Sequence, residues 1–220
     1  MAINIGINSI GFWSGITAFA ANALFVVVQI LQLFRVITYP FDEILIYGFS
    51  LCIVIPFIVE ILSLHYATVV RKRFWSHAAL LFTLIYAVFV SVNYVVQLTT
   101  VIPMTLKGEA DKVALLVQYP HSLLWDFDAI GYISMGLASV FVIPIFKKQG
   151  FDKWVRRAFM ANALVTPLIA FVYFYPDFSE RLLLLALPWA ITAPMMMLFL
   201  AIWFKKRQTN KANNETSIRS

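Results

Sequence analysis

A small group of polar side chains lies inside otherwise apolar stretches of the chain. Asn93 and Gln97 are four residues apart, so on a helix they share one face. Asp126 and Asp128 stand near the start of another apolar stretch. Amide and carboxyl groups that meet in this way can hold a cation, an amine or a file of water molecules. Polar groups inside a membrane are candidate functional residues, because they are costly to place there.

These polar residues are expected at one level of a bilayer. At a helical rise of about 1.5 Å per residue, Asn93 lies about 10 Å and Gln97 about 5 Å from the outer end of their stretch. The same count puts Asp126 about 5 Å and Asp128 about 8 Å deep. We therefore predict an outward-facing polar pocket formed by three stretches, with the candidate residues Gln29, Asn93, Gln97, His121, Asp126 and Asp128.

The same residues also have a purely structural interpretation. Asp126 and Asp128 stand in the first turns of a helix, where acidic groups favour the positive end of the helix dipole. They are about 200° apart around the helix, so they do not both face one pocket. Asn93 and Gln97 can simply hydrogen-bond to neighbouring helices. Both interpretations stay open here, and Asp128 is the stronger acidic candidate because it is deeper.

Glu60 is a separate candidate near the opposite end of its stretch. It lies about 24 Å along the helix from the outer start. A carboxyl group buried in a membrane can take up and release a proton, so Glu60 is a candidate for proton coupling. In the structural alternative, Glu60 bonds to a neighbouring helix or pairs with Arg71 or Arg73.

The sequence lacks the patterns of known catalytic and metal sites. His65 and His77 fall on one predicted side of the membrane and His121 on the other, whereas zinc needs clustered ligands. No HExxH, GxSxG or Walker sequence occurs, which removes the commonest catalytic signatures. Cys52 is the only cysteine, so an intrachain disulfide is excluded. We expect no metal and no cofactor, and we lean away from an enzyme.

Composition places these residues in a membrane protein. Hydrophobic residues make up 61% of the 220 residues and charged residues 13%, against about 25% charged in an ordinary soluble domain. The net charge is +6, but the basic residues stand at the ends of apolar runs and not among aromatic residues on one face. The expected partner is a lipid bilayer and not nucleic acid.

Six stretches are long enough to cross a bilayer, which takes about 20 residues per helix. We predict an all-α membrane protein, a compact bundle of six transmembrane helices over residues 1–207, followed by a disordered polar tail over 208–220. Gly11 and Gly15 form a GxxxG pattern, which favours close helix packing within the bundle. The predicted spans are 13–34, 44–70, 78–101, 123–146, 159–175 and 182–204.

Lys and Arg are distributed unevenly between the two sides of the predicted bundle. The second loop, the fourth loop and the tail carry 13 of the 17 basic residues, and the other three loops carry four. The positive-inside rule then puts both the N- and C-termini in the cytoplasm. We expect a multi-pass protein of the cell membrane, plasma or inner, and a homo-oligomer is compatible with the sequence.

Three functions are compatible with these residues. The leading hypothesis is a small transporter or channel for a small solute or cation that binds in the outer polar pocket. The alternative is a membrane-embedded enzyme acting on a lipid or quinone, with Asp128 or Glu60 as the acid or base and His121 as its partner. The third is a non-catalytic membrane binding or assembly subunit, in which the polar residues only join helices.

Overall fold

The computed structural model describes residues 6–219, with side chains described except at residue 180 and residues 210–219. The described chain is built from helices joined by turns and by one longer loop over residues 107–122. Six helical segments are long and apolar enough to cross a membrane. Helices suit this environment because a lipid interior offers no water to satisfy backbone N–H and C=O groups. The predicted all-α membrane bundle with six spans is confirmed at this level.

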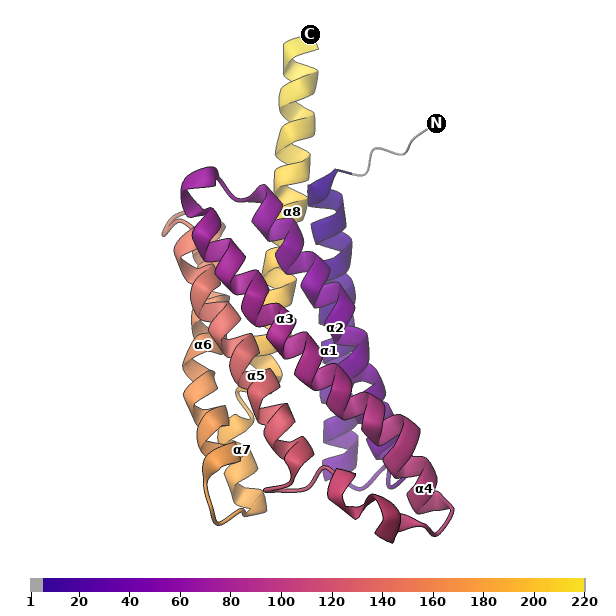
Figure 1. Ribbon diagram of the computed structural model, residues 1–220. Coiled ribbons are helices and arrows are strands. Elements are labelled where there is room, and N and C mark those ends of the chain that lie inside the picture. The colour runs from indigo at the N-terminus through magenta and orange to yellow at the C-terminus, as the bar shows by residue number, and fades with distance from the viewer. Residues whose placement is uncertain (1–5, 220) are drawn as a thin grey trace.

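The spans follow one another along the chain (Figure 1). The first is α1 (Ile7–Leu33) and the second is α2 (Phe41–Ala67). The third consists of a 3₁₀ turn (Val70–Lys72), α3 (Arg73–Val96), a π-helical segment (Gln97–Val101) and α4 (Ile102–Leu106). A 3₁₀ helix (Ala110–Leu116) lies in the long loop that follows.

The second half of the chain holds three further spans. The fourth is α5 (Leu123–Val142) with a 3₁₀ turn (Ile143–Ile145), and the fifth is α6 (Asp152–Phe174). The sixth is interrupted: a 3₁₀ turn (Glu180–Leu182) and the short α7 (Leu183–Ala186) are followed by α8 (Trp189–Arg219). Pro188 stands at this interruption and has no backbone N–H to continue the hydrogen bonds of the helix, while Leu187 before it keeps helical dihedral angles (φ −49°, ψ −39°).

Several helices extend beyond the stretches that hydropathy defines. α1 begins at Ile7, before the predicted residue 13, and α6 begins at Asp152, before residue 159. A helix continues into the polar headgroup layers, whereas hydropathy marks only the hydrocarbon part. α8 also remains helical to Arg219 through the tail that the sequence predicts to be disordered. Residues 205–219 contain no Gly or Pro, so nothing local ends a helix already formed by the apolar part.

The six spans form a closed ring in chain order. α2 packs on α3, α3 on α5, α5 on α6 and α6 on α8, and α1 closes the ring by packing on both α2 and α8. The start of α1 and the end of α8 lie at one end of the bundle, called here the terminal end. α4 and α7 lie at the opposite end, the loop end (Figure 1). That the terminal end faces the cytoplasm stays a prediction.

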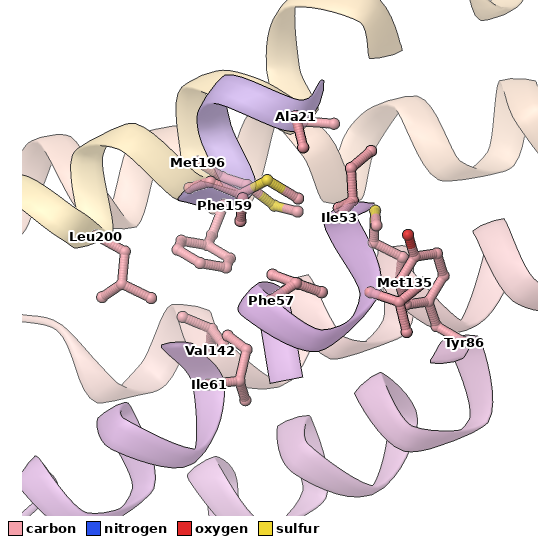
Figure 2. Close-up of a cluster of buried hydrophobic side chains, with 14 of the residues drawn as sticks. Ala21, Ile53, Phe57, Ile61, Tyr86, Met135, Val142, Phe159, Met196 and Leu200 are labelled. Carbon is pink, nitrogen blue, oxygen red and sulfur yellow. The ribbon is translucent and has the colours of Figure 1, made fainter. Parts of the chain in front are cut away.

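The middle of the ring is filled by apolar side chains. Figure 2 shows part of this cluster, which brings together side chains from helices far apart in the sequence. Phe57, Phe159 and Met196 are at most 1% exposed. Close packing of this kind leaves little room for change, because protein interiors are packed about as densely as organic crystals.

Glycines mark the closest helix contacts. A Cβ atom at Gly11 would lie 2.6 Å from the Phe204 ring, so α1 and α8 approach closely there. A Cβ at Gly131 would lie 2.6 Å from a methyl group of Val90 and would clash with it, so α5 and α3 also approach closely. The GxxxG pair thus lies on a contact face within one bundle, as small residues do at membrane helix interfaces.

Candidate functional site

The most strongly bonded buried carboxyl group in the membrane part belongs to Asp128, near the loop end of α5. The helix begins just before it because Ser122 caps α5, accepting a hydrogen bond from the Trp125 N–H at 3.2 Å. Asp128 is 4% exposed. Its Oδ2 accepts a hydrogen bond from the Tyr173 hydroxyl at 2.5 Å, and its Oδ1 accepts one from Asn93 Nδ2 at 3.3 Å. Three helices, α3, α5 and α6, therefore meet at this carboxyl group.

The long loop between α4 and α5 covers Asp128. Hydrogen bonds of the Gln97 and Gln118 side chains hold this loop in place. Asn93 Nδ2 also donates to Gln118 Oε1 at 3.0 Å. Gln97 Nε2 donates to the Leu116 carbonyl at 2.7 Å, and the Gln118 backbone N–H donates to Gln97 Oε1 at 3.4 Å. We call Asn93, Gln97, Gln118, Asp128 and Tyr173 the Asp128 cluster. The loop that follows the 3₁₀ helix thus covers the cluster at the loop end.

Aromatic side chains line the region around the cluster. The Tyr94 and Tyr132 hydroxyls lie 3.0 Å apart, and the Tyr132 ring stands edge-on to Trp189 with 5.0 Å between centroids. The Trp125 and Tyr173 rings are 4.6 Å apart. The Tyr47 and Tyr94 rings lie 5.2 Å apart, and the Tyr86 and Tyr132 rings lie 6.4 Å apart. Together with Tyr173, tyrosines from four helices lie in this region: Tyr47, Tyr86, Tyr94, Tyr132 and Tyr173. A carboxyl group surrounded by electron-rich rings is the arrangement that attracts an organic cation.

Three buried polar atoms in this region have no hydrogen-bond partner: Asn93 Oδ1, Ser50 Oγ and Trp189 Nε1. Ser50 lies on α2, and Trp189 opens α8 directly after the interruption of the sixth span. Buried polar groups in native proteins are nearly always satisfied by protein, water or ligand. These atoms are therefore the contacts that a bound ligand or an ordered water can complete.

Comparisons with family models, with curated proteins and with solved structures found no match to this chain.

The structure brings some of the predicted pocket residues together and leaves others apart. Asn93, Gln97 and Asp128 belong to one cluster. Asp126 is exposed, on another side of α5 from Asp128, as their angular separation requires. Gln29 and His121 are also exposed. Among the hydrogen bonds of the described side chains, none joins His121 to a carboxyl group, the contact that the enzyme hypothesis needs.

The sequence analysis missed several members of the site. Tyr173 and Gln118 are the direct partners of Asp128 and Asn93, and neither stands at an informative spacing from them. The excess of aromatic residues, 16% of the chain, was the only available signal for the surrounding rings. Near the same end, Gln32 Nε2 donates to Asp42 Oδ2 at 2.9 Å, a contact that joins α1 to α2 outside the cluster.

Glu60 occupies a different environment on α2. Its side chain is fully buried, and both carboxyl oxygens lack a hydrogen-bond partner. The structure thus shows neither the pairing with Arg71 or Arg73 nor the bond to a neighbouring helix that its structural interpretation requires. The carboxyl group packs against Gly15 of α1, where an added Cβ would collide with it and with Ala201 of α8. Within the described part of the chain, no three His, Cys, Asp or Glu side chains form a group that could hold a metal ion.

Proposed function

We propose that this protein is a membrane transporter for a small organic cation of the substituted-ammonium type, with the Asp128 cluster as its binding site. The observation that carries the proposal is the buried Asp128 carboxyl group, bonded by Tyr173 and Asn93 and set among aromatic rings. The groups around the site favour an organic cation. They supply one negative charge, amide oxygens and the faces of aromatic rings.

The electrostatics favour a cation at this position. A positive charge about 4 Å from a carboxylate gains roughly 4 kcal/mol at the effective dielectric constant of a site near a protein surface. A ring face adds about 0.5–2 kcal/mol when the cation is desolvated. Asn93 Oδ1, which has no donor, supplies a second acceptor. A metal ion takes less advantage of ring faces, and an anion would be repelled by Asp128.

Two irregular helix segments near the cluster support a transport cycle. Gln97 begins the π-helical segment Gln97–Val101 of the third span, and such segments recur at functional sites. The sixth span is interrupted just before Trp189. Interrupted spans form substrate sites in many transporters, because half-helix ends and unwound backbone groups there can contact the substrate. The loop that carries Leu116 and Gln118 covers the cluster, so a ligand enters from the loop end only when this loop moves away.

Flux into liposomes tests the proposal. Purified protein is reconstituted, and uptake of radiolabelled choline is measured against 3,3-dimethylbutanol, which has nearly the same shape without the charge. Protein-free liposomes give the background. Choline is permanently charged, so it cannot cross the bilayer as a neutral base. The wild type is expected to take up choline above background and not to accelerate entry of the alcohol.

Two matched variants locate the site. Asp128→Asn keeps the side-chain size and removes the charge, and it is expected to reduce choline uptake at least about tenfold, a loss of about 1.4 kcal/mol of binding. Asp126→Asn makes the same change on an exposed carboxyl group of the same helix and should leave uptake unchanged. Absence of choline uptake by the wild type, or equal uptake by Asp128→Asn, overturns the proposal.

A further inference from the structure

Glu60 is the one acidic side chain in the described membrane spans that is fully buried with neither carboxyl oxygen bonded. It stands seven residues before the end of α2 at Ala67, about 10 Å along the helix axis from the terminal end. The Asp128 cluster lies at the loop end. The bundle therefore holds two buried carboxyl groups in two separate layers.

The immediate surroundings of Glu60 contain no opposite charge. α1 has no charged residue along its whole length. On α8, Lys205 lies one turn beyond Ala201, but its Nζ sits 5.1 Å from the centre of the Phe12 ring and its side chain is exposed. His65 on α2 is bonded to Ser76, and His77 and Arg73 of α3 line a surface pocket with it. Neither carboxyl oxygen of Glu60 has a hydrogen-bond partner.

An ionised carboxyl group cannot persist in this position. Burying an isolated carboxylate without a partner costs several kcal/mol even after relaxation, and such a group takes up a proton instead. Glu60 is therefore neutral in this closed arrangement. It can ionise only when water or a cation reaches it, which requires the terminal end of the bundle to open.

A row of unsatisfied polar atoms lies between the two layers. Asn22 stands on the same face of α1 as Gly15, two turns or about 10 Å closer to the loop end. Its Nδ2 reaches Met197 Sδ at 3.8 Å, and its Oδ1 is buried without a partner. Ser50 lies on α2, about 15 Å along the axis from Glu60, and its Oγ is also unpaired. These unpaired atoms lie along the bundle between Glu60 and the Asp128 cluster, within the otherwise apolar interior.

We propose that Glu60 is the proton-exchange site of this protein and couples cation transport to proton movement in the opposite direction. In each cycle Glu60 gives one proton to water on one side of the membrane and takes up one proton from the other side, while one organic cation crosses the opposite way. No bond other than the carboxyl O–H is broken or formed, and net charge does not move. The inference rests on the proposed function of the Asp128 cluster.

Proteoliposomes with a pH-sensitive dye inside test the coupling. A choline gradient applied to the wild type is expected to drive proton movement that stays the same when the membrane potential is clamped to zero. Glu60→Gln keeps the size of the side chain but cannot release a proton. It should lose choline-driven proton movement to background, while equilibrium choline binding stays within about twofold of wild type, a difference of less than 0.5 kcal/mol.

Two further variants make the test specific. Glu43→Gln removes a half-buried carboxyl group from the opposite end of the same helix and should leave choline-driven proton movement intact. Glu60→Asp retains a carboxyl group and should restore part of the proton movement lost in Glu60→Gln. If Glu60→Gln moves protons as the wild type does, the coupling role is wrong while the proposed function stands. If the wild type moves choline without protons, the coupling is likewise wrong, and if it moves no choline, both proposals fail.

Discussion

The hydrogen bond between Tyr173 and Asp128 gives a sharp quantitative prediction. The two oxygens lie 2.5 Å apart, and Asp128 is almost fully buried. Hydrogen bonds to charged groups contribute about 1.5–3 kcal/mol, whereas double-mutant cycles in membrane proteins average about 0.6 and reach about 1.7 kcal/mol. A buried bond to a carboxyl group belongs at the upper end of the membrane range. We expect a coupling free energy of about 1.5 kcal/mol between the two side chains.

The measurement is a double-mutant cycle of unfolding free energies in bicelles. Tyr173→Phe removes only the hydroxyl, so the ring keeps its packing against Trp125 at 4.6 Å, and Asp128→Asn keeps the side-chain size. Asp126→Asn with Tyr175→Phe makes the same chemical changes at exposed positions and should show coupling near zero. A coupling below about 0.5 kcal/mol for the buried pair, within the error of additivity for unconnected sites, would refute the geometry of the site.

Three further predictions follow from other contacts. Gly15→Ala puts a methyl group into Glu60 and should lower the unfolding free energy by about 1–3 kcal/mol, while Gly48→Ala, with nothing within 4 Å, should be neutral or stabilising; equal effects would contradict the packing. Gln97→Ala releases the loop backbone at Leu116, so amide hydrogen exchange over 110–122 should accelerate, and unchanged protection there would show that the bond does not hold the loop. A protease-accessible tag after the last residue should be digested only from the cytoplasmic side; digestion from outside would overturn the predicted orientation.

The bundle itself was predictable because its signals are local in the sequence. Long apolar runs separated by charges set the number of spans, and an even number puts both ends on one side. Helix ends were harder to predict, since hydropathy marks the part of a helix in the hydrocarbon layer and not the full helix. The tail shows the same limit: its polar composition predicts disorder, whereas α8 continues through it to Arg219, and residues 205–219 contain neither Gly nor Pro, the two residues least favourable in a helix.

For the candidate site, the sequence predicted how deep the polar residues lie in the membrane but not which neighbours each of them faces. Counting residues places Asn93, Gln97 and Asp128 at one level, and the angle between Asp126 and Asp128 separates those two around their helix. Rotation of each helix about its own axis is set by tertiary packing, so the sequence could not show that Gln29 faces outward. Tyr173 meets Asp128 because α6 packs on α5, a long-range fact that no spacing within either helix encodes.

Equilibrium binding of choline to the purified protein tests the central claim most directly. Trp125 packs on Tyr173 of the Asp128 cluster, and Trp189 packs on Tyr132 nearby, so tryptophan fluorescence provides the signal without a label. The account predicts a saturable change with choline, no change with 3,3-dimethylbutanol, and loss of the choline response in Asp128→Asn but not in Asp126→Asn. A choline response that survives Asp128→Asn, or that the uncharged alcohol reproduces, would contradict a cation site at this carboxyl group.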